Sequence, residues 1–274
     1  MAISPPDQSG HVDRAVRILR PGNAPDEPAS RAIAVEAPVS LEYNGIAYAV
    51  MMATPADLVD YVTGFSLSEK LIETPADIED IDVHQAEKGW LVRTQLAGSR
   101  TETLLARVRV RVSESSCGLC GMDNLDEVMR PLPRVPAHQA PEKQALFRAL
   151  AELGDHQPLH NATGAVHAAA FADRKGHILH AREDVGRHNA LDKLIGCLAR
   201  QDKDPADGFI LTSSRCSYEM VEKSVRAGAN TLITISAPTS LAVARAEEAG
   251  LTLVALARPD AVLLMSRETG SFGL

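Results

Sequence analysis

The sequence predicts an α/β protein made of a smaller β-rich N-terminal domain and a C-terminal α/β sandwich with a mixed sheet. The chain of 274 residues exceeds the usual domain length of about 100–200 residues, so two domains are expected. Hydrophobic residues make up 45% and charged residues 23%, as in globular proteins with a buried core. Strand patterns dominate the first half, whereas strand and helix patterns alternate in the second half.

The N-terminal part is expected to begin with a disordered leader over residues 1–29, because these are rich in Pro, Gly, Asp and Ser. Strands are predicted over residues 33–39, 40–43, 46–52, 79–84, 90–96 and 104–112. The dipeptide Asn44-Gly45 is typical of a tight hairpin turn. The Thr-Pro-Ala-Asp sequence at 54–57 combines an N-cap, a first-turn proline and an acid, which predicts a helix reaching residue 72.

The last of these predicted strands carries three arginines that alternate with three valines. They are Arg107, Arg109 and Arg111, and Val108, Val110 and Val112. A period of two predicts one buried face and one basic face. The basic face is either simply solvated or a positive approach to the cysteine-containing loop that follows.

The C-terminal domain is expected to span residues 135–274, and the N-terminal domain 30–134, because the proline-rich segment before residue 135 is typical of a linker. Helices are predicted over residues 142–153, 187–200, 217–227 and 239–248. Strands are predicted over residues 164–171, 177–181, 209–213, 231–235, 251–256 and 261–265. This order of elements predicts the mixed sheet of an α/β sandwich.

Composition also excludes several classes of function. A net charge of -8 argues against broad electrostatic binding to nucleic acid or to anionic membranes. The sequence contains no apolar run of about 18 residues and no signal-peptide pattern, so a cytoplasmic protein without a membrane partner is expected. Four cysteines are too few for a disulfide scaffold.

Two of these cysteines, Cys117 and Cys120, are separated by two residues in a predicted loop over 113–130. Such a pair can bind metal, form a reversible disulfide or carry sulfur. Structural zinc is disfavoured because Cys197 and Cys216 do not form a second pair. Dithiol redox chemistry is disfavoured because the flanking glycines keep the pair in a loop and not at the start of a helix. A flexible loop suits a cysteine that carries sulfur from one site to another. Cys197 and Cys216 are expected to be core residues.

Three predicted strand ends carry polar residues that suit an anionic ligand. In α/β sheets, ligands bind at the carboxyl ends of strands, near helix N-termini. The first end includes Thr212 and Ser213, the second spans residues 236–240, and the third includes Arg187 and His188. Ordinary N-capping is the alternative explanation for the first two ends. In the third, His188 lies one helical turn before Asp192, so a purely structural pair is the alternative there.

Six segments, in order, resemble the FdhD/NarQ family of formate dehydrogenase accessory sulfurtransferases. They are residues 64–69, 116–121, 163–169, 182–193, 212–219 and 236–242. The resemblance implies that a cysteine desulfurase loads sulfur onto Cys117, the first cysteine of the pair. Cys120 then either relays or releases this sulfur, or is dispensable. The resemblance also implies that the bound substrate is a molybdenum bis(pyranopterin guanine dinucleotide) cofactor, which receives the sulfur before its insertion into formate dehydrogenase.

The resemblance extends to the cofactor-binding segment and to the fold. The segment corresponds to Leu256, Ala257, Arg258, Pro259, Asp260 and Ala261. The C-terminal domain is expected to have a cytidine-deaminase-like fold, and a homodimer is expected for such a protein. A zinc deaminase needs a histidine or cysteine ligand with a catalytic glutamate, and a Pro-Cys-x-x-Cys pair. Because Ala168 follows His167 and no second cysteine follows Cys216 closely, neither deamination nor a resident metal is expected.

Two other functions remain as alternatives to the sulfurtransferase. The chain could be a chaperone that only holds the molybdenum cofactor, with the cysteines incidental, or a zinc-binding structural protein.

Overall fold

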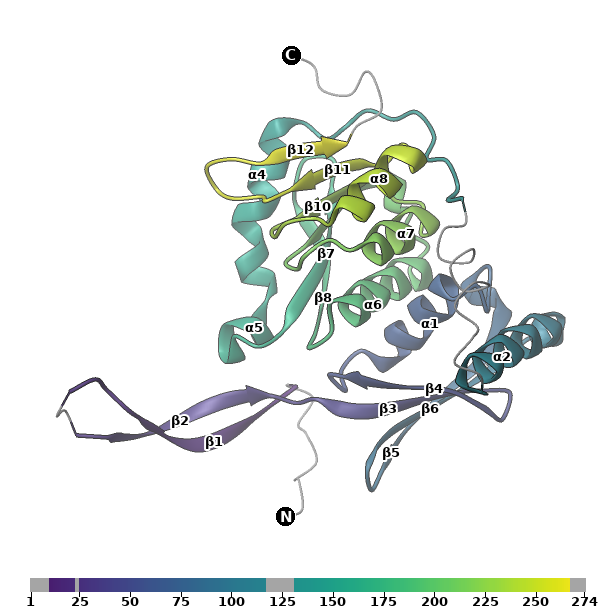
Figure 1. The fold of residues 1–274 in the computed structure, drawn as a ribbon, viewed down its shortest axis with the longest axis horizontal. Coiled ribbons are helices and arrows are strands. Elements are labelled where there is room, and N and C mark those ends of the chain that lie inside the picture. Colours follow the sequence, from purple (N-terminus) through teal and green to yellow (C-terminus); the bar gives the residue numbers. More distant parts are fainter. Residues whose placement is uncertain (1–9, 23–24, 117–130, 267–274) are drawn as a thin grey trace.

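A six-stranded mixed sheet organises the C-terminal part of the chain (Figure 1). The computed structural model describes residues 10–22, 25–116 and 131–266. The strand order is β12-β11-β10-β9-β7-β8, with β9, β10 and β11 parallel. The strands are β7 (His167–Asp173), β8 (Ile178–Asp184), β9 (Gly208–Thr212), β10 (Thr231–Thr234), β11 (Thr252–Ala255) and β12 (Leu263–Ser266). The three parallel strands are fully buried, as expected for a sheet covered on both faces.

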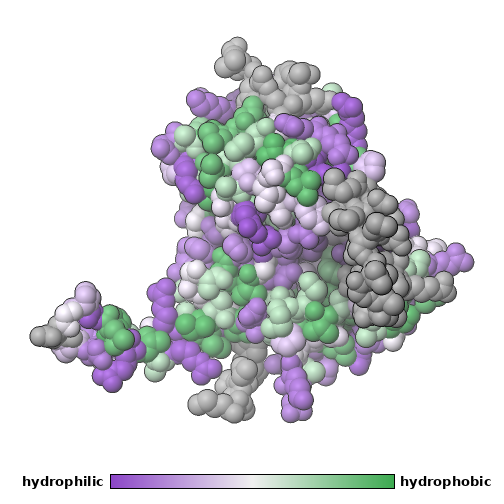
Figure 2. All heavy atoms as spheres, viewed as in Figure 1, coloured by the Kyte–Doolittle hydropathy of each residue, from purple (hydrophilic) through white to green (hydrophobic). Residues whose placement is uncertain are grey.

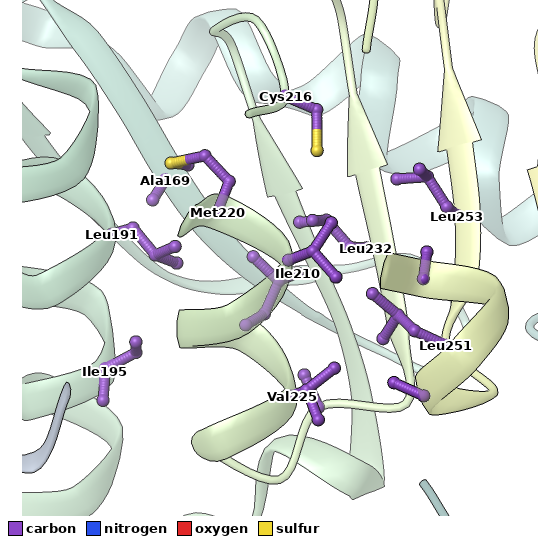
Figure 3. Close-up of a cluster of buried hydrophobic side chains, with 14 of the residues drawn as sticks. Ala169, Leu191, Ile195, Ile210, Cys216, Met220, Val225, Leu232, Leu251 and Leu253 are labelled. Carbon is purple, nitrogen blue, oxygen red and sulfur yellow. The ribbon is translucent and has the colours of Figure 1, made fainter. Parts of the chain in front are cut away.

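Helices cover both faces of this sheet and create two hydrophobic layers. The helices are α4 (Lys143–Glu152), α5 (Pro158–Thr163), α6 (Arg187–Arg200), α7 (Tyr218–Arg226) and α8 (Ser240–Ala249). Figure 3 shows Ile210 and Leu232 of the sheet facing Met220 and Val225 of α7. On the other face, Phe209 packs near α4. The predicted α/β sandwich with a mixed sheet is confirmed.

A four-stranded sheet, ordered β4-β3-β6-β5, forms the N-terminal part. Its strands are β3 (Ala37–Tyr43), β4 (Ile46–Ala53), β5 (Ile78–Ala86) and β6 (Gly89–Leu96). The predicted hairpin is confirmed, because Asn44 and Gly45 both have positive φ angles (48° and 79°) between β3 and β4. Helix α1 (Leu58–Ser68) packs its aromatic residues against one face of the sheet.

Residues 104–112, predicted as a strand, belong instead to helix α2 (Thr101–Ser116). Leu104 and Val108 are four residues apart, and both pack into the core of the N-terminal sheet. Residues at this spacing lie on one face of a helix, so burial of these two side chains favours a helix over a strand. Residues two apart in a helix lie about 200° apart around its axis, so the alternation with valine does not create one basic face. The prediction of a shared face for Arg107, Arg109 and Arg111 was therefore wrong.

The expected disordered leader is also wrong for the residues that the structure describes. Strands β1 (His11–Ile18) and β2 (Glu27–Ala34) form a two-stranded antiparallel ribbon that projects from the body of the molecule (Figure 1). Val12 lies opposite Ile33, and Val16 lies opposite Ala29. The apolar residues of the two strands alternate, but the average composition of residues 1–29 hides this pattern. The prolines and glycines that dominate that composition are concentrated outside the strands.

Helices α1 and α6 join the two parts of the chain through closely packed glycines. A Cβ atom added at Gly64 would lie 1.8 Å from the carbonyl oxygen of Asp192. One added at Gly196 would lie 1.9 Å from the carbonyl oxygen of Asp60. Only glycine therefore allows the two helix backbones to approach this closely. Within the ranges given above, no helix is long and apolar enough to cross a membrane.

Candidate functional site

The cysteine loop cannot be placed directly, because Cys117, Cys120 and most of the segment 113–130 lie outside the described residues. Helix α2 includes residues 113–116, so the predicted loop is helical at its start, and the helix ends at Ser116. After it, the chain is anchored on the C-terminal part, where Leu132 and Val135 are buried, and the backbone N–H of Val135 donates to the Ala249 carbonyl oxygen (2.7 Å).

A surface cavity of about 310 Å³ lies between the two parts of the chain. Arg107 of α2 lines it together with residues of α1, α6 and α7. Asp192 sits at its base, where Lys223 Nζ lies 2.7 Å from both carboxylate oxygens, and Ser68 Oγ donates to Oδ1 at 2.7 Å. The cavity is therefore polar, with the charge of this buried carboxylate compensated by α7.

His188 connects the N-termini of α6 and α7 at the edge of the same cavity. Its Nε2 atom lies 3.0 Å from Glu219 Oε2 and 3.3 Å from Ser217 Oγ. The hydrogen bond from His188 lowers the pKa of Glu219. The structural pair considered for His188 and Asp192 does not form, because α7 offers each of them a closer partner, Glu219 and Lys223 respectively.

The predicted binding segments on β9 and after β11 meet at one edge of the six-stranded sheet. The Ile235 N–H donates to the Thr212 carbonyl oxygen (3.0 Å), and the Ala257 N–H donates to the Thr234 carbonyl oxygen (3.1 Å). The carboxyl ends of parallel strands lie together for geometric reasons, so this edge is where a ligand is expected. Ser213 lies here too, and its Oγ accepts the N–H of Ala168 (2.8 Å).

Two polar atoms near this edge have no hydrogen-bond partner among the described residues. They are the buried Oγ1 of Thr212 and the buried Nε of Arg187, the first residue of α6. Burial and the neighbouring Arg187 guanidinium lower the pKa of His167. Buried polar atoms are normally paired, so these two orphaned groups mark a place where a polar ligand would be stabilised.

The segment 256–261 is a turn next to the same edge. Leu256 has a left-handed φ of 49°, and the Arg258 N–H donates to the Ala261 carbonyl oxygen (2.8 Å). Arg258 Nη1 also donates to the Ile235 carbonyl oxygen (2.6 Å). The exposed residues 258–261 can meet a ligand, whereas Ala257 is 2% exposed and packs in the core.

The two described cysteines belong to the core. Cys216 is fully buried, and burial raises the pKa of its thiol to about 12. Cys197 is 1% exposed, and its Sγ accepts hydrogen bonds from Arg182 Nη2 (3.0 Å) and Gln201 Nε2 (3.2 Å). Across the described part of the chain, no three His, Cys, Asp or Glu side chains are grouped so that they could hold a metal ion.

Sequence reasoning missed the buried ion pair that supports this region. Lys193 Nζ lies 2.7 Å from Asp184 Oδ2, and both side chains are fully buried. Lys193 Nζ also donates to the Thr54 carbonyl oxygen (2.9 Å), and Asp184 accepts the Thr54 N–H (3.0 Å). The signal in the sequence was a lysine in the helical stretch 190–198, which is apolar except for this lysine and Asp192. Thr54 thus binds the C-terminal part instead of capping α1, which begins at Leu58.

Comparison with known proteins places the chain in a family. The model of the FdhD/NarQ family matches residues 34–269. "Sulfur carrier protein FdhD" of Bordetella petrii is 43% identical over 253 residues, which cover 92% of this chain and 91% of that protein. The protein of the same name from Variovorax paradoxus is 46% identical over 232 residues, which cover 85% and 84%.

A solved structure shows the same fold. It is the crystal structure of a protein from Desulfotalea psychrophila described as a formate dehydrogenase accessory protein. It matches with a TM-score of 0.74 and 22% sequence identity, covering 94% of this chain and 98% of that chain. The match to the family model and the identity to these relatives lead to one conclusion: the chain belongs to the FdhD/NarQ family.

Proposed function

We propose that the chain is a sulfurtransferase that carries sulfur as a persulfide on Cys117. It takes the sulfur from a cysteine desulfurase and passes it to a molybdenum bis(pyranopterin guanine dinucleotide) cofactor before that cofactor enters formate dehydrogenase. The observation that carries the proposal is extensive identity to relatives named sulfur carrier proteins. We further propose that the protein acts in the cytoplasm as a homodimer.

The first chemical step is thiol–persulfide exchange. The Cys117 thiolate attacks the terminal sulfur of the donor persulfide, a new S–S bond forms on Cys117, and the donor cysteine leaves as a thiolate. No external oxidant or reductant is needed, because one S–S bond replaces another. In the second step the S–S bond of the Cys117 persulfide breaks and Cys117 leaves as a thiolate. The terminal sulfur, transferred as neutral sulfur, would become a sulfide ligand by taking two electrons from the metal of the substrate cofactor.

The edge of the six-stranded sheet fits the phosphates of this cofactor. Strand alternation places the Thr212 side chain on the same face as Ile210, toward α6 and α7, at the carboxyl end of β9. The orphaned Thr212 hydroxyl can donate to a phosphate oxygen, and Arg187 can add a guanidinium donor. The N-terminus of α6, at Arg187 and His188, supplies a favourable dipole. The exposed turn 258–261 borders the same edge.

Two cavities between the two parts of the chain are lined by residues that precede or follow the cysteine segment in the sequence. The 310 Å³ cavity includes Arg107, which precedes the loop. A second cavity of about 420 Å³ includes Pro133, which follows the loop. The two cavities share four lining residues, Ser68, Lys70, Lys223 and Arg226. Residues that precede and follow the cysteine segment in the sequence thus line two neighbouring cavities, which supports transfer in this region.

The test is sulfur loading of the full chain by a cysteine desulfurase and cysteine, followed by mass spectrometry. We expect the mass of one added sulfur atom on the peptide containing Cys117, lost in Cys117→Ala. We also expect Cys117→Ala to remain folded and to abolish maturation of formate dehydrogenase activity. The Cys216→Ala variant is the control, and it should load normally because that thiol is buried.

Two results would contradict the proposal. Absence of a sulfur adduct, combined with cofactor binding, would indicate the cofactor chaperone instead. Stoichiometric zinc in the purified protein, lost in Cys117→Ala and Cys120→Ala, would indicate the structural zinc protein.

A further inference from the structure

His167 lies at the edge of the six-stranded sheet to which the cofactor phosphates were assigned above. It is the first residue of β7, which runs antiparallel to β9. Ala169 is the Cα partner of Thr212, so His167 lies two residues, or about 7 Å, along β7 from the residue opposite Thr212. The start of β7 and the carboxyl end of β9 therefore form one edge of the sheet.

The His167 side chain lies on the same face of the sheet as the orphaned Thr212 hydroxyl. Residues two apart along a strand share a face, and Ala169 of β7 packs into the same core layer as Ile210 of β9. Strand alternation thus directs both His167 and Thr212 toward α6 and α7. Arg187, the first residue of α6, is near enough for its charge to act on the His167 ring.

The surroundings of this end of α6 are polar. The helix begins at the junction between the two parts of the chain, where Asn189 Nδ2 donates to the Met52 carbonyl oxygen (2.8 Å). Figure 2 shows mostly hydrophilic residues along this junction on the face drawn. A charged ligand at the start of α6 thus meets polar groups and not an apolar surface.

The His167 ring is half-buried and has no hydrogen-bond or ion-pair partner among the residues that the structure describes. The charged and titratable groups around it are Arg187 and His188 of α6, His160 of α5 and Asp184 of β8. Asp184 favours a proton on His167, but it already forms an ion pair with Lys193. Burial and then the Arg187 charge lower the pKa of His167, so without a ligand the ring is mostly neutral at neutral pH.

We propose that His167 is a further phosphate ligand of this site and that it gains a proton when the phosphate binds. The inference rests on the proposed function, which assigns the cofactor phosphates to this edge. A phosphate held by Arg187 and Thr212 brings negative charge to the sheet face that carries His167, and this charge favours the imidazolium form. The imidazolium then donates a charge-assisted hydrogen bond to a phosphate oxygen. The proton comes from the solvent, and no covalent bond to the phosphate forms.

This linkage fixes the direction of the pH dependence. Above the pKa of His167 in the complex, the ring is neutral with and without the phosphate, so affinity does not depend on this group. As the pH falls through that pKa, the complex binds a proton that the free protein does not bind, and affinity increases. Below the pKa in the free protein, both states carry the proton and the gain is complete.

The test is isothermal titration calorimetry of the full chain with GDP-mannose. This probe contains guanosine diphosphate as a pyrophosphate diester, which lacks the phosphate proton that titrates near pH 6 in a phosphate monoester. We expect the dissociation constant to be at least about fivefold lower at about pH 5.5 than at about pH 8. Titrations at neutral pH in buffers of different ionisation enthalpy should show net proton uptake on binding.

Variants assign this proton to one ring. His167→Gln keeps a hydrogen-bond donor but does not titrate, so its dissociation constant should change by less than about twofold between the two pH values, without proton uptake. Arg187→Gln should bind about tenfold more weakly at both pH values, because the phosphate loses a guanidinium. His177→Gln is the matched control and should behave as the wild type, because His177 lies in an exposed turn beside Glu152. Circular dichroism at both pH values checks the fold of each variant.

Three results would overturn the proposal. They are wild-type binding without proton uptake, a folded His167→Gln protein that keeps the wild-type pH dependence, and no binding of GDP-mannose to the wild type at either pH. The first two leave the proposed function intact, because they concern only the charge of His167. The proposed function fails on a separate measurement, the absence of a sulfur adduct on Cys117, which does not depend on His167.

Discussion

At the scale of single residues, the environment of each described cysteine determines its reactivity. A thiol reacts as a thiolate, so both burial and a raised pKa suppress its chemistry. Cys216 is fully buried with a pKa raised to about 12. Burial also raises the pKa of Cys197, although the neighbouring Arg182 acts in the opposite direction. Neither residue is therefore a suitable carrier of sulfur.

Alkylation tests this difference. At pH 8, a thiol of pKa about 12 is ionised in only about one molecule in ten thousand. In a chain carrying Cys117→Ala and Cys120→Ala, native protein should therefore take up no iodoacetamide, whereas protein unfolded in urea should be labelled at Cys197 and Cys216. Intact-mass spectrometry checks both states. Rapid labelling of either core cysteine in the native protein would contradict the burial described above.

At the scale of elements, the close approach of α1 and α6 brings together the residues that these two helices contribute to the 310 Å³ cavity. Ser68 at the end of α1 bonds to Asp192 of α6 in the cavity, and this is possible because Gly64 lies against the Asp192 backbone. A side chain at that position would move the helices apart. The shape of the cavity and the packing of the two helices therefore both depend on the glycine at position 64.

The substitution Gly64→Ala should therefore destabilise the protein by about 1–3 kcal/mol or more, which is typical of overpacking in a core. The reason is the 1.8 Å distance between the new Cβ and the Asp192 carbonyl oxygen. Urea unfolding followed by circular dichroism measures the change. Gly98→Ala is the control, because its Cβ would meet no atom within 4 Å, and a change within about 0.5 kcal/mol is expected. Equal stability of the two variants would contradict the packing argument.

At the scale of the whole molecule, polar contacts join the two parts of the chain around a buried ion pair. Lys193 and Asp184 both bind the backbone of Thr54, which follows strand β4 of the N-terminal sheet. A second set connects Asp60 of α1 to Arg182 of β8 at 2.7 Å. A buried pair is not by itself strongly stabilising, but the loss of one partner leaves an uncompensated charge.

The variant Lys193→Met should thus lose about 3–5 kcal/mol of unfolding free energy, because Asp184 would remain buried without its cation. Calorimetry and limited proteolysis should show a lower transition temperature and cleavage between the two parts. Lys88→Met, at an exposed turn, is the control and should change stability by no more than about 0.5 kcal/mol. A Lys193→Met protein as stable as this control would show that the pair does not hold the parts together.

Local signals predicted much of the fold. The Asn44-Gly45 hairpin and most helices of the C-terminal part follow from turn chemistry and from periods set by backbone geometry. Helix α2 was missed because an arginine–valine alternation imitates a strand until the positions of Leu104 and Val108 against the core are known. The β1–β2 arm was missed because its pairing is between segments that look like a leader by composition.

The sequence by itself determined the α/β class, the Cys117–Cys120 spacing, and the polar strand end at Thr212 and Ser213. These features depend on local periodicity, spacing and the general geometry of parallel strands. Only the tertiary structure decided that Glu219 is the partner of His188, and that the buried Thr212 hydroxyl has no partner among the residues that the structure describes. Contacts between distant segments depend on how whole elements pack, and no local pattern encodes that packing.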